Sequence, residues 1–182
     1  IVGGNVETSQ RITDLVLRVS NAQASSQGTM NNLTIGGEGW AYYETLGGGS
    51  GAGEKGDGVS AVQVHMTNTR ATDPEILEAR LPLAVRQMAI RRSTGGEGLH
   101  RGGDGLTREL ELLECATVSL LCTRRKTGAP GLLGGAPGVP GEDFVFQKGQ
   151  WKTWDGEILS MEPGDRVRVC TPGGGGWKLE DS

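Results

Sequence analysis

The sequence predicts an α+β fold, with two helices in its first half and mainly antiparallel β-strands with glycine-rich loops in its second half. Apolar residues recur every three or four positions between Thr8 and Val19, whereas beyond Pro82 they recur every second position. Glycine and proline account for 32 and 7 of the 182 residues, below the roughly 25–30% that is typical of low-complexity chains. We therefore expect one folded, turn-rich unit over residues 1–182.

The first predicted element is an amphipathic helix over residues 8–19, with Thr8 or Ser9 as its N-cap. Its apolar residues are spaced at i, i+3, i+4 and i+7, which predicts a single face buried against the core. These residues are Ile12, Leu15, Val16 and Val19.

Residues 20–60 are polar and rich in glycine, which predicts short strands and loops with a ligand-facing turn at 47–51. Residues 61–66 alternate well enough for a strand. A short second helix is then expected, because Asp73 can cap it, Pro74 suits its first position and Pro82 stops it.

Antiparallel strands are predicted beyond Pro82, since runs with a period of two are bounded by Gly, Pro or Asp turns. Residues 106–113 also fit a helix, because their leucines suit a period of 3.6 as well. Residues 128–141 are predicted to form a turn-rich loop. The apolar pairs and triplets that mark the strands are Leu83/Val85, Met88/Ile90, Leu106/Leu110/Leu112, Val118/Leu120/Cys122, Phe144/Phe146 and Val167/Val169.

Composition excludes several classes of protein. The net charge is −4 and no stripe of Lys or Arg is present, so nucleic-acid binding is not expected. No apolar run approaches the roughly 18 residues of a membrane span. Three cysteines without Cys-x-x-Cys spacing favour a reducing, cytoplasmic setting, and we expect Cys115 and Cys122 to be buried packing residues. The chain begins at Ile1 without a Met, so we expect an excised or processed piece of a longer polypeptide.

The segment 65–73 concentrates polar chemistry after a predicted strand. His65 can transfer protons near neutral pH, Asn68 and Thr69 can hydrogen-bond an amide or an oxyanion, and Arg70 can hold a carboxylate. A structural interpretation is also open, in which Asn68 and Thr69 satisfy a turn and Asp73 only caps a helix.

The glycine-rich segments 47–53 and 173–176 lack the Gly-Lys-Ser/Thr ending of a phosphate loop. Their glycines suit close backbone packing, although the first segment could also form the rim of a substrate pocket beside Tyr43 and Glu44. His100 and Asp104 are expected in a structural turn. With only two histidines and no close acidic companions, no metal site is expected from this chain alone.

Several collinear segments resemble the C-terminal portion of the hydantoinase B/oxoprolinase family, and residues 65–75 are most similar to its 5-oxoprolinase branch. The segments are NVETSQRITD (5–14), SQGTMNNLTIGG (26–37), YYETLGGGSGA (42–52), GDGVSAVQVHMTNTRATDPEILEAR (56–80), RGGDGLTREL (101–110) and TPGGGGW (171–177).

The resemblance implies an ATP-dependent opening of a cyclic amide, in which 5-oxoproline, ATP and water give glutamate, ADP and phosphate. It also implies that a hydantoinase A-type subunit or domain handles ATP, that any divalent metal is bound by upstream sequence, and that the enzyme is an oligomer. An acetone carboxylase-type subunit and a non-catalytic assembly module are the alternatives.

On this hypothesis His65, Asn68 and Thr69 are catalytic, with His65 as acid or base and the other two polarising the amide. Arg70 holds the substrate carboxylate. The remaining residues predicted to contact substrate are Tyr43, Glu44, Gly48, Gly49, Ser50 and Asp73.

Overall fold

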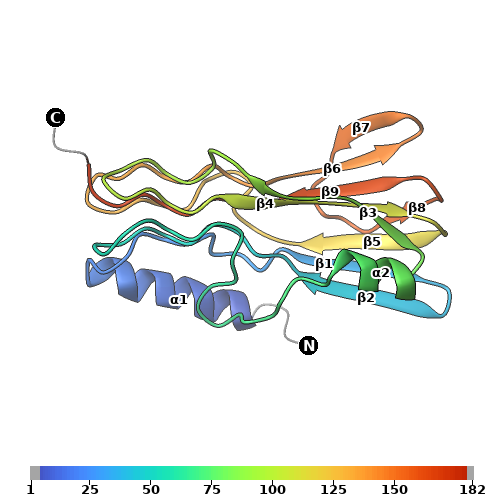
Figure 1. The fold of residues 1–182 in the computed structure, drawn as a ribbon, viewed down its shortest axis with the longest axis horizontal. Helices are drawn as coiled ribbons and strands as arrows, with labels where there is room; N and C mark the ends of the chain where they lie inside the picture. The colour runs from blue at the N-terminus through green and yellow to red at the C-terminus, as the bar shows by residue number, and fades with distance from the viewer. Residues whose placement is uncertain (1–4, 180–182) are drawn as a thin grey trace.

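The computed structural model describes residues 5–179, which form two stacked antiparallel sheets that continue at one end into a bundle of extended segments (Figure 1). One sheet has the strand order β2-β1-β5-β8 and the other β3-β4-β9-β6-β7. The elements are α1 (Asn5–Val19), β1 (Asn32–Gly37), β2 (Trp40–Thr45), α2 (Pro74–Arg80), β3 (Leu83–Arg91), β4 (Gly105–Leu112), β5 (Ala116–Leu121), β6 (Glu142–Gln147), β7 (Gln150–Thr153), β8 (Leu159–Met161) and β9 (Arg166–Cys170).

The apolar core lies between the two sheets. Inward-facing residues alternate along each strand, as expected for sheets with one buried face. Leu33 and Ile35 of β1 and Leu110 and Leu112 of β4 are fully buried in one cluster. Leu106, Leu110 and Leu112 therefore follow the period of a strand, Leu113 lies exposed just beyond it, and the helical alternative for this segment is wrong.

Strand β3 contains a bulge between Val85 and Gln87. A bulge inserts one extra residue and reverses which side chains face inward beyond it. This explains why the apolar residues change from odd positions (Leu83, Val85) to even positions (Met88, Ile90) within one continuous strand.

Beyond the sheets, five extended segments pack side by side, and we call them the glycine bundle: residues 22–31, 46–60, 94–104, 128–140 and 171–178 (Figure 1). Backbone hydrogen bonds join the segments, for example from Gly49 N to Pro172 O at 3.0 Å and from Gly96 N to Gly174 O at 2.8 Å. A Cβ at Gly49 would lie 1.9 Å from Gly103 O. Glycine is required there because backbones approach too closely for a side chain, as at the axis of collagen.

The glycine bundle changes the interpretation of residues 128–141. This segment runs mostly extended within the bundle and is not a loop dominated by turns. Its glycines face neighbouring backbone, since a Cβ at Gly138 would lie 2.5 Å from Gly173 O.

Helix α1 is present, but its predicted orientation is wrong. It begins at Asn5, so Thr8 and Ser9 lie inside the helix and neither is its N-cap. Its polar face is buried, with Gln10 and Asp14 almost inaccessible to solvent. The surface against which α1 packs is polar, because Asp14 accepts a hydrogen bond from Ser26 N of the bundle and Gln10 donates one to Thr67 of the loop that follows it. The apolar residues that face solvent are Ile12, Leu15, Val16 and Val19, which are 57%, 58%, 60% and 77% exposed.

The predicted strand at 61–66 is absent. The φ angles of Ala61 and His65 are 51° and 53°. Both lie in the left-handed region, which interrupts an extended strand. Only an isolated bridge between Val62 and Gly48 forms. Helix α2 is confirmed, because Asp73 caps it through the backbone N–H groups of Glu75 and Ile76, and Pro74 occupies its first turn.

The three cysteines are free, and they differ in burial. Cys170 is buried and Cys122 is half-buried, whereas Cys115 is exposed, so the prediction of a buried Cys115 is wrong. Cys115 lies in the turn before β5 and points to Glu162, with Sγ 3.0 Å from the carboxylate.

Neither described helix is long and apolar enough to span a membrane.

Candidate functional site

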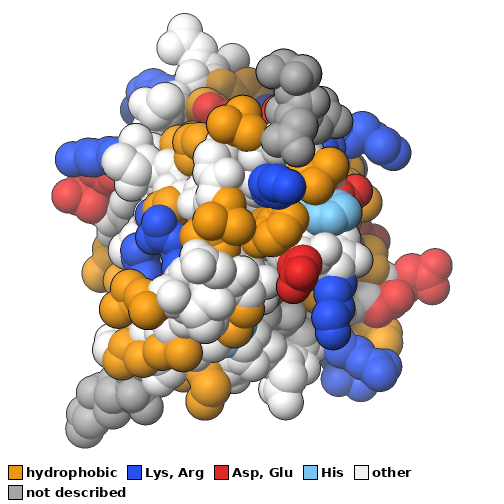
Figure 2. All heavy atoms as spheres, turned by 90° about the vertical axis from the view of Figure 1, so that its left-hand side faces the viewer, with side chains coloured by type: hydrophobic (Ala, Val, Ile, Leu, Met, Phe, Trp, Pro, Cys, Tyr) orange, Lys and Arg blue, Asp and Glu red, His pale blue; other side chains and the backbone are white. Residues whose placement is uncertain are grey.

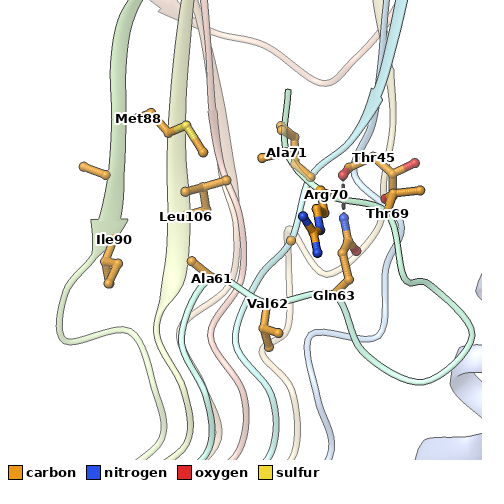
Figure 3. A pocket seen from close by; sticks show the side chains of 13 residues that line it. Thr45, Ala61, Val62, Gln63, Thr69, Arg70, Ala71, Met88, Ile90 and Leu106 are labelled. Atoms are coloured by element: carbon orange, nitrogen blue, oxygen red, sulfur yellow. Dashed lines mark hydrogen bonds between the residues drawn. The ribbon is translucent and has the colours of Figure 1, made fainter. Parts of the chain in front are cut away.

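A cavity of about 450 Å³ opens where the loop 61–71 passes the strands of the second sheet. One wall carries polar side chains of this loop, namely Gln63, Thr69 and Arg70 (Figure 3). The opposite wall is apolar and is formed by Met88 and Ile90 of β3 with Leu106 of β4. The remaining lining residues are Thr45, Leu46, Gly47, Ala61, Val62, Ala71 and Ala89.

The guanidinium of Arg70 is available to a ligand. Within residues 5–179 the Arg70 side chain has no hydrogen bond or ion pair, whereas Gln63 is held by a 2.5 Å hydrogen bond from its Nε2 to Thr45 O. A free guanidinium can bind a carboxylate through two parallel hydrogen bonds. Because the opposite wall is apolar, the cavity suits a small molecule with a carboxylate at one end and methylene groups at the other.

The loop that carries Arg70 is fixed from β2. Glu44 is buried and its carboxylate accepts a 2.9 Å hydrogen bond from Thr72 N. Its charge is balanced by buried Arg108 of β4, with 3.4 Å between guanidinium and carboxylate. Burial raises the pKa of neighbouring Tyr42 to about 12, and the negative charge of Glu44 contributes to the shift. Glu44 therefore does not line the cavity but anchors the loop two residues after Arg70.

His65 lies apart from the cavity, at the interface with α1. Its Nε2 is 2.9 Å from Asp14 Oδ1, and both side chains are almost completely buried. Asp14 Oδ1 also accepts a 3.0 Å hydrogen bond from Ser26 N. Nearby, Gln10 donates a 2.6 Å hydrogen bond to Thr67 Oγ1, so two polar contacts fasten the segment 65–67 to the helix.

The other predicted site residues are not gathered in one place. Asn68 is exposed next to Thr69, and Tyr43 is exposed on the face of β2 opposite Glu44. Gly48 and Gly49 are buried in the glycine bundle, and Ser50 Oγ accepts a hydrogen bond from Val59 N within the same bundle. Asp73 caps α2.

Sequence reasoning missed the apolar wall and the partner of His65. Alternation in the sequence marks Met88 and Ile90 only as strand residues, and their partial exposure beside the cavity is visible only in the structure. Nothing in the sequence identifies Asp14 as the partner of His65, since its only distinction is its place four residues after Gln10 on the same helix face. His100 and Asp104 are structural, as expected: His100 stacks on Trp177, and Asp104 accepts hydrogen bonds from Thr94 N and Gly95 N.

The model of the family "Hydantoinase B/oxoprolinase" matches residues 1–178. The chain belongs to the hydantoinase B/oxoprolinase family. It is 49% identical to 5-oxoprolinase 1 of Arabidopsis thaliana over 97% of its length, and 46% identical to 5-oxoprolinase of Dictyostelium discoideum over its whole length. It spans 14% of the length of each of these relatives.

Solved structures of two enzymes share the fold of this hydantoinase B/oxoprolinase chain. An ATP-dependent caprolactamase from Pseudomonas jessenii superposes with a TM-score of 0.70 at 22% identity, covering 88% of this chain and 31% of the caprolactamase chain. A nucleotide-free acetone carboxylase superposes with a TM-score of 0.68 at 20% identity, covering 86% of this chain and 26% of the other. At these identities the likeness concerns the fold.

Proposed function

We propose that this chain is part of an ATP-dependent hydrolase that opens 5-oxoproline to glutamate, with ATP and water consumed and ADP and phosphate released. The observation that carries the proposal is the 49% and 46% identity to two 5-oxoprolinases across nearly the whole chain. A lactam is stabilised by resonance, and transfer of a phosphoryl group to its oxygen makes the ring carbon electrophilic enough for attack by water.

The proposed substrate site is the cavity beside Arg70. The guanidinium of Arg70 binds the carboxylate of 5-oxoproline, and the methylene groups of the ring pack against Met88 and Leu106. Thr69, on the same wall, hydrogen-bonds the amide. The free guanidinium and the apolar wall that faces it support this assignment.

The predicted roles of His65 in proton transfer and of Asn68 in polarising the amide have less support, because neither side chain lines the cavity. When Nε2–H of His65 donates its hydrogen bond to the Asp14 carboxylate, Nδ1 is the nitrogen that can accept a proton. The predicted contacts of substrate with Tyr43, Glu44, Gly48, Gly49, Ser50 and Asp73 have less support, because the cavity lining includes none of these side chains.

ATP is bound elsewhere in the proposed enzyme, by a hydantoinase A-type domain or subunit. The glycine-rich segments of this chain support this division, because they are committed to backbone packing within the bundle. The family resemblance further suggests that any divalent metal is bound by another part of the enzyme. We infer a cytoplasmic setting from the three free thiols, and the oligomeric state rests on the family resemblance alone.

Arg70→Ala tests the site in the complete enzyme with its ATP-binding part. We expect the KM for 5-oxoproline to rise about tenfold or more, because the substitution removes a charge-assisted contact. The same variant should leave the turnover of 2-pyrrolidinone, the ring without a carboxylate, unchanged. Arg80→Ala in the last turn of α2 is the matched control. Equal losses with both substrates would refute the role of Arg70, whereas no glutamate from the wild type would refute the proposed function itself.

A further inference from the structure

Helix α1 presents an apolar face to solvent, which we call the α1 stripe: Ile12, Leu15, Val16 and Val19. We propose that the α1 stripe is the docking surface for an amphipathic helix with an acidic border, contributed by another part of the same enzyme. This interface is independent of the substrate and of the cavity beside Arg70.

The α1 stripe is not needed to hold the helix to this chain. The opposite face does that through buried polar contacts, with Asp14 bonded to Ser26 N and His65, and Gln10 bonded to Thr67. The four stripe residues stand at i, i+3, i+4 and i+7, which forms the continuous ridge that a second helix packs against. Figure 2 shows apolar side chains gathered on the end of the molecule to which α1 belongs.

Positive charge borders the stripe on one side. Arg11 and Arg18 are seven residues apart, so they lie on the same side of the helix, between the stripe and the buried face. Arg124 lies against them, and its pKa is lowered by burial and by the positive charges of Arg11 and Arg18. The carboxylates of Asp14 and Glu7 partly oppose this effect.

Arg18 is the arginine of this border that lacks a partner in the described part of the chain. Within residues 5–179 its guanidinium has no hydrogen bond or ion pair, whereas Arg11 pairs with Glu7 at 3.5 Å and Arg124 donates a 3.0 Å hydrogen bond to Gly128 O. An Asp or Glu side chain along the edge of a docked helix would pair with the guanidinium of Arg18 and balance its charge.

The occupant is assigned to the same enzyme rather than to a second copy of this chain. Both 5-oxoprolinase relatives carry most of their length outside the matched region, since that region is 14% of each. Antiparallel two-fold pairing of two α1 stripes would bring the arginine borders of both copies together, and like charges disfavour that arrangement.

The direct test is photo-crosslinking in the complete enzyme, with a photoreactive amino acid at Val16 and, as a control, at Ile158, which is 78% exposed. We expect Val16 to crosslink to an apolar segment with Asp or Glu at its border, outside residues 5–179, with a yield at least tenfold above that of Ile158. Crosslinks only to α1 of a second copy, or a yield equal to that of the control, would overturn the proposal.

A second measurement isolates the charge. Arg18→Glu should lower the yield of the Val16 crosslink at least tenfold, whereas Arg18→Lys should retain most of it. The yield is measured in the complete enzyme, with and without added salt. If Arg18→Glu crosslinks like the wild type at every salt concentration, the acidic border is excluded.

Discussion

Nε2 of His65 lies 2.9 Å from Oδ1 of Asp14, and this buried pair joins the loop that leads to the cavity with the N-terminal helix. His65 has a φ of 53°, a left-handed conformation that is unusual for a residue with a side chain. The pairing with Asp14 compensates for this conformation, so the position of the loop depends on α1.

Asp14→Ala should therefore destabilise the fold. The substitution leaves the imidazole of His65 and the N–H of Ser26 buried without an acceptor, which costs about 1–3 kcal/mol. Asp14→Asn keeps an acceptor oxygen and should lose less. Urea unfolding at pH 7 measures both, and a double-mutant cycle with His65→Ala should show coupling of about 0.5–3 kcal/mol. Additive losses would mean that the pair makes no contribution of its own.

Substitution of a glycine by alanine should destabilise the protein far more in the glycine bundle than in the sheets. Gly49→Ala would place a Cβ 1.9 Å from Gly103 O, and we expect a loss of at least about 3 kcal/mol or failure to fold. Gly36→Ala in β1 meets nothing within 4 Å, so its free energy of unfolding should change by less than about 1 kcal/mol. Thermal unfolding measures the melting temperature of each variant, and Gly49→Ala should melt well below Gly36→Ala. Similar melting temperatures would contradict close backbone packing in the bundle.

The stability contributed by Asp104 should depend on pH. Burial alone would raise its pKa, but the N–H groups of Gly95 and Thr94 and the charge of Arg101 hold the pKa below its usual value. A carboxyl group with a lowered folded pKa stabilises the protein above its unfolded pKa, about 3.9, and loses that contribution as the pH falls through the folded value. The difference in unfolding free energy between wild type and Asp104→Asn should therefore be largest above about pH 5 and should decrease below about pH 4. A difference that stays constant between pH 7 and pH 3 would refute this.

The thiols should differ in reactivity. Cys115 is exposed and should be alkylated first, while burial raises the pKa of Cys122 to about 12 and keeps it protonated. The hydrogen bond to Glu162 raises the pKa of Cys115, so Glu162→Gln should increase its rate of alkylation at pH 7. Mass spectrometry of partially labelled protein shows the order in which the three cysteines are alkylated. Labelling of Cys122 or Cys170 before Cys115 would contradict the burial described.

The strands and the second helix could be predicted from sequence because their signals are local. Asp73-Pro74 defines the start of α2, and alternation defines the strands even in β4, where a helical period also fitted. The orientation of α1 could not be predicted in this way. Periodicity identifies an apolar face but not what covers it, and α1 packs on a bundle whose surface is polar backbone.

The candidate site was predictable only in part for a similar reason. Thr69 and Arg70 could be chosen by residue type, and both line the cavity. The separation of His65 from Arg70 depends on the left-handed conformation of His65, whereas the alternation of residues 61–66 predicts a strand there. The apolar wall comes from β3, and no pattern within the loop could indicate that this strand lies opposite.

The enzyme to which we propose this chain belongs opens 5-oxoproline and hydrolyses ATP. The most direct measurement is the release of glutamate and phosphate from 5-oxoproline and ATP by the complete enzyme, with acetone and bicarbonate as the alternative substrates. We expect glutamate and phosphate to appear together, with no glutamate when ATP is omitted. Consumption of ATP only with acetone and bicarbonate, without glutamate from 5-oxoproline, would contradict the claim.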